Sequence, residues 1–333
     1  MPKSSAARLY RGTPLELVRL ARLLRAGELV AVPTETVYGL AANALDARAC
    51  RKIFSAKGRP ITDPLIVHFH ALAQLDAIAE TNGAARRLAK AFWPGPLTLV
   101  LPRRKSVPAI VSAGLPSVAV RMPAHPLFRR LLKLVGVPLA APSANPFGYV
   151  SPTTAQHVQD GLGKKIAHIL DGGPAKIGLE STILDVRDPA RPRLLRPGAI
   201  TRAELEAALG CRVSAPPRRA EEKNRGAQLA PGLLKRHYSP RTPVVLHDVL
   251  TAAAARAGLR DEAWVLAAKP AGRNMKNIFW LDARGDLRGT ARQLFSTLRQ
   301  LDDGRFKKIH VALAVGDGLA EAINDRLRRA AAR

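Results

Sequence analysis

The chain has few cysteines and few aromatic residues. Of its 333 residues, two are cysteines, Cys50 and Cys211, and 5% are Phe, Trp or Tyr. Two cysteines so far apart suit neither a disulfide framework nor a zinc site, and this scarcity is typical of a reducing cytoplasm. The low aromatic content argues against a surface that stacks on single-stranded nucleic acid.

Long hydrophobic runs are also missing. The most apolar stretch, residues 135–144, is interrupted by Pro138 and Pro142, and no run approaches the ~18 apolar residues of a membrane helix. No apolar core follows the basic residues at the N-terminus, as it would in a secretory signal. We therefore expect a cytoplasmic protein without a membrane partner.

Several catalytic and nucleotide-binding signatures do not occur. The chain lacks Gly-x-x-x-x-Gly-Lys-Ser/Thr, Gly-x-Gly-x-x-Gly, Gly-x-Ser-x-Gly and His-Glu-x-x-His, which argues against the corresponding P-loop, dinucleotide, hydrolase and zinc-protease sites. His68 and His70 lie two residues apart, but no nearby Cys or carboxylate completes a metal site. We expect no metal bound by protein side chains alone.

Positive charge is abundant. Lys and Arg number 53 against 26 Asp and Glu, a net charge of +27. Residues 245–333 hold 16 cations and 10 anions and the remainder holds 37 and 16, so the excess lies before residue 245. Such a charge favours anionic partners such as nucleotides, pyrophosphate or RNA. An arginine- and alanine-rich genome explains the excess equally well, because the arginines are spread along the chain.

The hydrophobic pattern divides the chain into two α/β domains, as its length also suggests. In the first domain, residues 13–205, Thr13 is placed to cap a helix at 14–26, and Gly27 is placed to end it. Further helices are expected at 47–56, 71–79, 84–92 and 127–135, and strands at 29–32, 64–69, 97–101, 117–121, 137–142, 166–170 and 181–186. This pattern predicts a sheet of mixed strand direction with polar motifs in loops at the strand ends.

A linker, residues 206–243, separates this domain from a smaller one at 244–333. Prolines are frequent in the linker, and no hydrophobic period continues there. Beyond it, strands are expected at 244–246, 263–268, 278–281 and 308–314, and helices at 248–257, 290–301 and 319–329. This alternation predicts a small parallel α/β domain.

Two short polar motifs suggest a binding site. Because Pro60 disfavours the helical region for Arg59, we expect residues 57–59 to be extended, so that Lys57 and Arg59 point to one face. Gly58 between them would let a ligand approach the backbone. On its own, such a Lys-x-Arg pair is usually a solvated basic surface.

Ser143 and Asn145 repeat the same spacing before Pro146. A Ser-x-Asn pair beside prolines is by itself usually turn chemistry. Two cations together with a hydroxyl and an amide, however, suit an anionic ligand such as a nucleotide.

These motifs belong to an ordered set of segments. The set is VPTETVYGL (32–40), SAKGRP (55–60), PGPLTLV (94–100), APSANPFG (141–148), SPTTA (151–155), LDGGP (170–174), GLESTI (178–183) and LRPG (195–198). It closely resembles the YrdC-like family, the threonylcarbamoyl-AMP synthases, over about residues 15–201. The segment APGLLKRHYSP (230–240) is similar to the linker of the long, two-domain form of that family.

The resemblance implies a YrdC-like mixed, twisted sheet with a concave active-site cavity, plus a smaller Rossmann-like C-terminal α/β domain. It also implies a nucleotidyltransferase that makes threonylcarbamoyl-AMP and pyrophosphate from L-threonine, bicarbonate and ATP. The product would pass to the tRNA threonylcarbamoyl transferase complex. Such chemistry requires positioning and charge neutralisation more than a protein nucleophile.

The resemblance also implies roles for residues. Catalysis is assigned to Lys57, Arg59, Ser143 and Asn145. ATP binding is assigned to these four together with Asp63, Ser117, Ser151, Arg196, His237 and Tyr238. L-threonine binding is assigned to Thr36, His68, Arg121, Ala141 and Ser181. Mg²⁺ is expected to arrive on the ATP phosphates, and residues 228–240 are expected to form a lid over the nucleotide.

Two other functions are compatible with parts of the sequence. A basic RNA-binding module without catalysis would account for the charge, and weak tRNA binding is compatible with either function. The carbamoyl-transfer enzymes of hydrogenase maturation share the YrdC-like fold. They carry additional zinc-finger and acylphosphatase domains, whose cysteine pattern is absent from these 333 residues.

Overall fold

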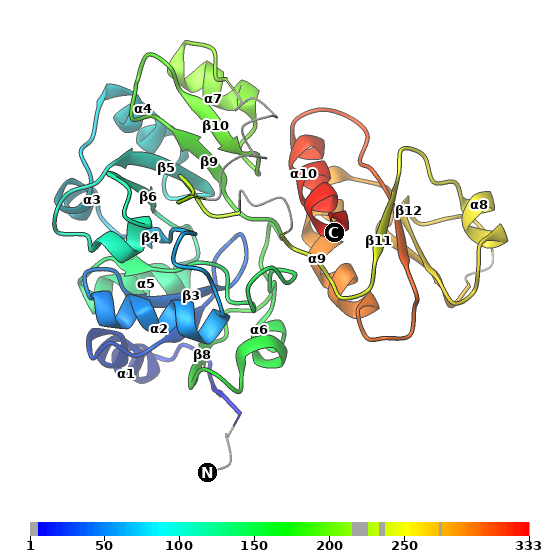
Figure 1. Ribbon diagram of the computed structural model, residues 1–333, viewed down its shortest axis with the longest axis horizontal. Coiled ribbons are helices and arrows are strands. Elements are labelled where there is room, and N and C mark those ends of the chain that lie inside the picture. Colours follow the sequence, from blue (N-terminus) through cyan, green and yellow to red (C-terminus); the bar gives the residue numbers. More distant parts are fainter. Residues whose placement is uncertain (1–5, 215–225, 233–236, 273–274, 333) are drawn as a thin grey trace.

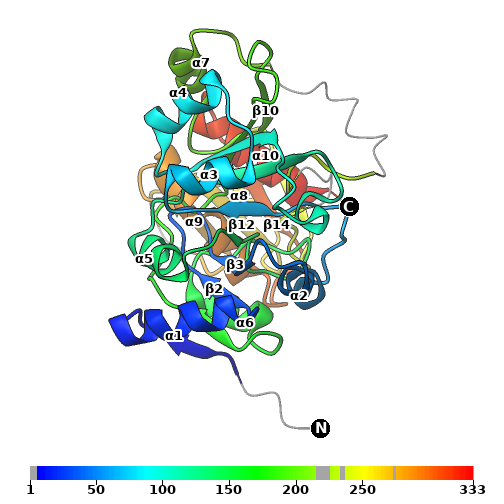
Figure 2. The ribbon, with the colours of Figure 1, turned by 90° about the vertical axis from the view of Figure 1, so that its left-hand side faces the viewer.

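The computed structural model describes residues 6–214, 226–232, 237–272 and 275–332. They form two α/β domains that lie side by side (Figure 1). Viewed from the side of the first domain, the helices of the C-terminal domain lie behind it (Figure 2). None of the helices in these ranges is long and apolar enough to cross a membrane.

The first domain is built on one ten-stranded mixed sheet in the order β1-β8-β2-β3-β7-β4-β6-β5-β9-β10. Its strands are β1 (Arg8–Tyr10), β2 (Val30–Val32), β3 (Gly39–Asn43), β4 (Ile66–His68), β5 (Leu97–Pro102), β6 (Ser117–Arg121), β7 (Leu139–Ala140), β8 (His168–Leu170), β9 (Thr182–Asp185) and β10 (Arg193–Arg196). Its helices are α1 (Pro14–Arg25), α2 (Ala47–Lys57), α3 (Leu72–Ile78), α4 (Gly83–Phe92), the 3₁₀ turn η1 (Ala109–Ser112), α5 (Pro126–Val135), α6 (Ala155–Leu162) and α7 (Arg202–Leu209). Strand β4 pairs parallel to β6 but antiparallel to β7, so the mixed sheet is confirmed.

The C-terminal domain has a four-stranded sheet in the order β11-β14-β12-β13, and its three pairings are all parallel. Its elements are β11 (Val244–His247), α8 (Ala252–Ala257), β12 (Ala263–Ala268), β13 (Ile278–Asp282), α9 (Leu287–Leu301), β14 (Ile309–Ala312) and α10 (Leu319–Ala331). Helices α9 and α10 lie on the side of this sheet that faces the first domain, and α8 lies on the far side (Figure 1). The small parallel domain is therefore also confirmed.

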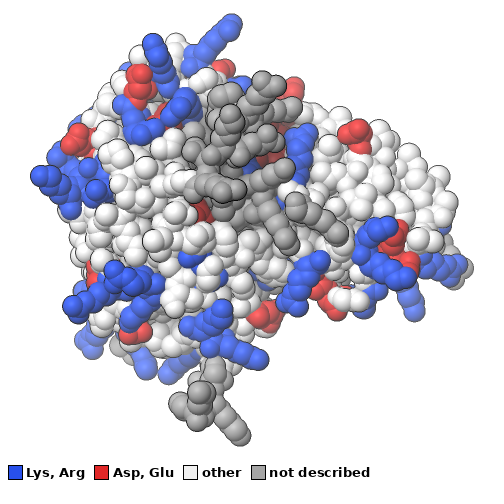
Figure 3. Space-filling view, in the orientation of Figure 1, with Lys and Arg blue, Asp and Glu red and all other residues white. Residues whose placement is uncertain are grey.

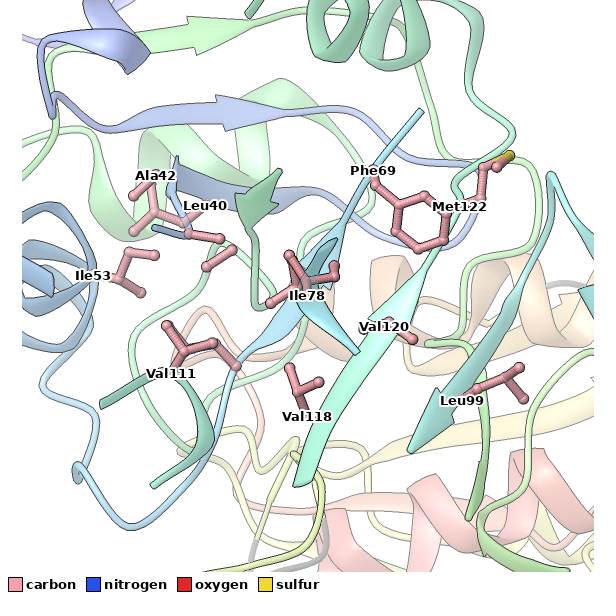
Figure 4. Close-up of a cluster of buried hydrophobic side chains, with 14 of the residues drawn as sticks. Leu40, Ala42, Ile53, Phe69, Ile78, Leu99, Val111, Val118, Val120 and Met122 are labelled. Carbon is pink, nitrogen blue, oxygen red and sulfur yellow. The ribbon is translucent and has the colours of Figure 1, made fainter. Parts of the chain in front are cut away.

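The first domain's core lies between its sheet and the covering helices. Ile53 of α2 and Ile78 of α3 are fully or almost fully buried and pack toward strand residues such as Leu40 and Val120 (Figure 4). Burial of an aliphatic side chain of this size contributes about 1.5–3 kcal/mol relative to an exposed position. This packing leaves the loops at the strand ends free to carry polar groups.

The helix signals near the N-terminus are confirmed. The Thr13 side chain accepts a hydrogen bond from the Glu16 backbone, and Glu16 accepts one in return from the Thr13 backbone. Pro14 occupies the first helical position, and Gly27 follows the helix with a φ of +80°. These residues fix α1 at both ends.

The expectation of an extended segment at residues 57–59 is wrong. Lys57 is the last residue of α2, and Gly58 ends the helix in the left-handed region with a φ of +64°. Pro60 restricts only the residue before it, so the helix is able to continue through Lys57. The side chains of Lys57 and Arg59 are both buried nevertheless, at 3% and 6% exposed.

Other differences concern short elements. The predictions did not include β1, β3, β10, α6 or α7, and the strands expected at 64–69 and 137–142 shorten to β4 and β7. Strand β3 reads Gly-Leu-Ala-Ala-Asn, which has no β-branched or aromatic residue, so its conformation follows from its buried position in the sheet. Helix α7 continues past residue 205, the predicted end of the first domain.

We predict that Gly58→Ala lowers the free energy of unfolding by about 1 kcal/mol, because an L-residue is strained at this positive φ. A Cβ at Gly58 would meet no atom within 4 Å, so backbone strain is the only cost. Urea denaturation measures the change, with Gly83→Ala as the control. Gly83 has ordinary backbone angles and an open environment. Equal losses in the two variants would contradict the assignment of strain.

Candidate active site

A pocket opens where the ends of strands of the first domain meet Pro231, Gly232, His237 and Tyr238. It is lined by ten of the fifteen predicted site residues: Thr36, Arg59, His68, Arg121, Ala141, Ser143, Ser181, Arg196, His237 and Tyr238. The cavity is small, about 40 Å³. Since a water needs roughly 10–15 Å³ measured this way, the pocket in this closed arrangement holds only a few waters.

The other five predicted residues lie behind the lining. Lys57 donates hydrogen bonds of 2.5 Å to the carbonyl oxygens of both Ser143 and Asn145. The Asn145 amide donates to the carbonyls of Pro146 and Tyr149. Lys57 therefore fixes the loop that carries Ser143, and Asn145 closes that loop on itself.

The remaining three have distinct surroundings. Asp63 forms an ion pair of 3.0 Å with Arg59, and Ser151 donates through its hydroxyl to Glu180. Ser117 begins β6 and has a buried hydroxyl without a partner among the described residues. It shares a strand face with Arg121, because the two residues are an even number apart.

Arg59 and Asp63 form one charged end of the pocket. Both side chains are buried, and Arg59 also donates to the backbone carbonyls of Asp63 and Pro64. Burial raises the pKa of Asp63, although Arg59, Lys57 and Arg196 oppose that shift. The cluster thus contains more cations than anions, which suits a ligand with several negative charges.

Arg121 also lines the pocket and forms a second charged cluster. Its guanidinium donates to Glu35 at 2.7 Å, to the Thr36 hydroxyl at 3.0 Å and to the Gly95 carbonyl at 3.2 Å. Burial alone would raise the pKa of Glu35, but the charge and hydrogen bond of Arg121 outweigh it and lower the pKa. The sequence interpretation did not include Glu35, whose only signal was its place beside Thr36.

His68 lies beside Arg121 on the neighbouring strand. Its Nδ1 is 3.2 Å from the Ile66 carbonyl, and the ring is 2% exposed. Burial, with a further contribution from Arg121, lowers the pKa of His68 to about 3. The imidazole is therefore neutral at physiological pH and offers a hydrogen-bonding group without adding charge.

Arg196 connects the sheet to the segment that covers the pocket. It donates to the Ser181 hydroxyl and carbonyl, both at 3.1 Å, and to the Pro231 carbonyl at 3.1 Å. The Ser181 hydroxyl also lies 2.7 Å from the Thr98 hydroxyl. Ser181 is thereby held in a defined orientation toward the cavity.

His237 and Tyr238 cover the pocket from the linker side. The Tyr238 backbone has a φ of +60°, and the two rings lie edge to face with centroids 4.1 Å apart. Burial and the nearby cations, Arg59 first among them, lower the pKa of His237 well below its ordinary value. Lys235 and Arg236, which the sequence places beside these rings, lie outside the described residues.

Three further polar side chains that line the pocket were not identified as site residues from the sequence: Thr34, Tyr38 and Glu180. Thr34 and Tyr38 stand in the 32–40 motif and Glu180 in the 178–183 motif, so the segments were recognised but these members were not. Among the described residues, no group of three or more His, Cys, Asp or Glu is placed to hold a metal ion.

These observations define a class: two-domain α/β proteins with a buried, arginine-lined pocket at the ends of a mixed sheet. Residues 22–198 match the Sua5, YciO and YrdC family model, described as telomere recombination, and residues 200–332 match the threonylcarbamoyl-AMP synthase C-terminal domain. The chain belongs to the YrdC-like family of threonylcarbamoyl-AMP synthases, in its long, two-domain form.

Individual relatives are similar in sequence to this chain over nearly its whole length. The chain is 41% identical over 331 residues to the threonylcarbamoyl-AMP synthase of Pyrococcus abyssi, with 93% of this chain and 92% of the relative covered. The enzyme of Bacillus subtilis is 39% identical over 326 residues, with 95% and 93% covered. The crystal structure of P. abyssi Sua5 complexed with L-threonine matches with a TM-score of 0.88 and 38% identity, over 98% of this chain and 97% of that one.

We predict that acid destabilises the protein partly through His68. The unfolded chain binds a proton at this group below its ordinary pKa of 6.5, whereas the folded chain does so only near pH 3. Stability is therefore complete above pH 6.5 and falls toward pH 3, by as much as about 1.4 kcal/mol per pH unit from this residue. In His68→Gln, urea denaturation between pH 7 and pH 4 should show a shallower loss, and an unchanged slope would contradict the prediction.

Proposed function

We propose that the protein is an L-threonylcarbamoyladenylate synthase, a nucleotidyltransferase that forms threonylcarbamoyl-AMP and pyrophosphate from L-threonine, bicarbonate and ATP. The observation that carries the proposal is the buried pocket in which Arg59, Arg121 and Arg196 surround the hydroxyls of Ser143 and Ser181. The L-threonine complex of the P. abyssi relative supports it.

The chemistry divides between Arg121 on one hand and Arg59 and Arg196 on the other. Arg121 suits the threonine carboxylate, because a guanidinium binds a carboxylate through two parallel hydrogen bonds. Arg59 and Arg196 suit the ATP phosphates. In this reaction the threonine amine first combines with bicarbonate, with loss of water, to give a carbamate. A carbamate oxygen then attacks the α-phosphorus in line while pyrophosphate leaves, and the fixed cations stabilise the charge that develops.

Magnesium fits this arrangement as a companion of ATP. Bound to the phosphates, Mg²⁺ would neutralise charge on the triphosphate and on the departing pyrophosphate. Asp63 is engaged with Arg59, and Glu35 with Arg121. These two carboxylates therefore serve first to hold the arginines in position.

The product is a mixed anhydride that a tRNA-modifying transferase complex would consume to make threonylcarbamoyladenosine. The alternative function is direct tRNA binding through the net positive charge of the chain. Lys and Arg are dispersed around both domains on the face in Figure 3 and do not gather into one patch there. Steeply salt-dependent tRNA binding, without threonine-dependent pyrophosphate release, would favour the RNA-binding function instead.

The test of the reaction is pyrophosphate release from ATP that requires both threonine and bicarbonate. We predict that Arg59→Ala reduces this release about 100-fold, the size expected when a charge-stabilising group is lost. Lys57→Ala should reduce it about as much, because misplacing a positioned group is similarly costly and Lys57 holds the loop that carries Ser143. Arg59→Ala also leaves Asp63 buried without its cation, which is destabilising. Arg59→Lys keeps the positive charge and separates the two effects.

Arg86→Ala is the matched control, because Arg86 is an exposed arginine that pairs with Asp76. It should retain full activity. Wild-type release by both the Lys57 and the Arg59 alanine variants would refute the proposed phosphate site.

We predict that threonine is selected over valine by a factor of about 10⁴ in kcat/KM. A site that hydrogen-bonds a substrate hydroxyl leaves its own buried polar groups unpaired when that hydroxyl is missing. Thr36, His68 and Ser181 are the candidate partners. Competition kinetics with the two amino acids measure the ratio, and equal kcat/KM values would exclude a hydroxyl-binding pocket here.

The segment at 228–240 is proposed as a lid. Four residues of this segment line the pocket: Pro231, Gly232, His237 and Tyr238. The pocket volume is about 40 Å³, whereas a drug-sized ligand needs roughly 300–1,000 Å³. ATP therefore enters only if this segment withdraws. Closure afterwards would protect a carbamoyl adenylate from water.

We predict that replacing both His237 and Tyr238 by Ala weakens ATP binding or releases hydrolysed intermediate. Limited proteolysis of the segment should slow when ATP and threonine are present together, because the closed arrangement is then more populated. The double variant should lose this protection. Cleavage rates that ignore ligands, combined with full product yield from the double variant, would show that the segment is only a tether.

A further inference from the structure

We propose that Arg326, on α10 of the C-terminal domain, is a positioning residue of the active site that neutralises and orients Glu180. In this way it keeps the pocket receptive to the phosphates of ATP. The identity of the ligand rests on the proposed function. The residue's contacts stand independently of it.

Arg326 crosses from one domain to the other. Its side chain is 0% exposed, the largest of the fully buried side chains in the described ranges. It forms an ion pair of 2.9 Å with Glu180 and donates at 2.9 Å to the Pro197 carbonyl. Both partners belong to the first domain, in the loops around β9 and β10. The neighbouring Asp325 accepts a further hydrogen bond at 2.8 Å.

Glu180 links Arg326 to the active site. It lines the pocket, and its second carboxylate oxygen accepts from the Ser151 hydroxyl. A carboxylate in the wall of a buried triphosphate site repels the ligand strongly, because charges interact more strongly away from water. The guanidinium of Arg326 cancels that charge and, with Ser151, fixes both oxygens.

The same guanidinium also supports the covering segment. Its central carbon lies 5.4 Å from the centroid of the Tyr238 ring, within the range of a cation–π interaction. No described residue after Tyr238 lines the pocket. Arg326 therefore connects the C-terminal domain to the cavity by way of Glu180 in the wall and Tyr238 in the cover. The Arg329 carbonyl and the Phe295 ring of the same domain contact the cover, at His237 and Tyr238 respectively.

Domain docking alone is the competing explanation, and Arg299 provides a matched control. Arg299, on α9, is also largely buried and crosses to the first domain, where it donates to the carbonyls of Val150, Ser151 and His157. It meets backbone oxygens there and no pocket carboxylate. Removing either arginine weakens docking, but only Arg326 leaves a charge uncompensated in the pocket wall.

The experiment compares Arg326→Met, Arg326→Lys, Glu180→Gln, the Arg326→Met/Glu180→Gln double variant and Arg299→Met in the full chain. Pyrophosphate release gives KM for ATP and for threonine, calorimetry gives ATP affinity, and thermal unfolding reports stability. We expect Arg326→Met to raise KM for ATP by about tenfold or more, as when one partner of a buried pair is removed. KM for threonine should change by less than about twofold, because Arg121 is untouched.

Adding Glu180→Gln to Arg326→Met should recover most of the ATP affinity, since the uncompensated carboxylate is then gone. Arg326→Lys should fall between wild type and Arg326→Met, and it is the test variant if the methionine variant does not fold. Arg299→Met should lower thermal stability and leave KM for ATP unchanged.

Equal increases of KM for ATP in Arg326→Met and Arg299→Met, or no recovery in the double variant, would overturn the proposal. If only the lysine variant folds, a wild-type KM for ATP in Arg326→Lys, or no recovery when Glu180→Gln is added to Arg326→Lys, would do the same. Absence of threonine-dependent pyrophosphate release from the wild type would refute the proposed reaction instead. ATP affinities from calorimetry would still test Arg326 in that case.

Discussion

Three buried ion pairs form the framework on which the pocket depends: Arg59 with Asp63, Arg121 with Glu35, and Arg326 with Glu180. Taking a charge out of water costs several kcal/mol per ion, and only good geometry with additional hydrogen bonds offsets that cost. Each of these arginines has such bonds to backbone carbonyls. The protein thus keeps these three cations buried at or near the pocket, each paired with a carboxylate.

The sheet supplies the rigidity that this framework requires. The Arg59–Asp63 pair precedes β4, Arg121 ends β6 and Glu180 precedes β9. Strands of one sheet therefore fix the backbone of all three ion pairs on the side of the first domain. The cover packs on that sheet through apolar contacts, because Ala230 is buried in a cluster with residues of β4, β5, β6, β9 and β10. Loose packing here would misplace the cations, and a displacement of about 1 Å is enough to cost much of the rate.

The amino-acid sequence predicts the parts of this arrangement that depend on local chemistry. The caps of α1 and the alternation that gives two α/β domains follow from spacing and residue type. Ten of the residues that line the pocket were identified because their motifs resemble those of the YrdC-like family. Three of the charged partners, Glu35, Glu180 and Arg326, were not identified. Glu35 meets Arg121 across 86 positions and Arg326 meets Glu180 across 146, and no periodicity relates residues so far apart. The predicted extended conformation of Lys57 is wrong for a different reason, because helix α2 ends one residue later than the position of Pro60 suggested.

We propose that the arginine-lined pocket joins threonine, a carbon from bicarbonate and the adenylyl part of ATP in one molecule. The decisive measurement is mass spectrometry of the product formed from ¹³C-bicarbonate, L-threonine and ATP. We expect a species that contains threonine and AMP and gains about one mass unit from the labelled carbon, formed only when all three substrates are present. An unlabelled threonyl adenylate, or AMP formed without threonine, would contradict it.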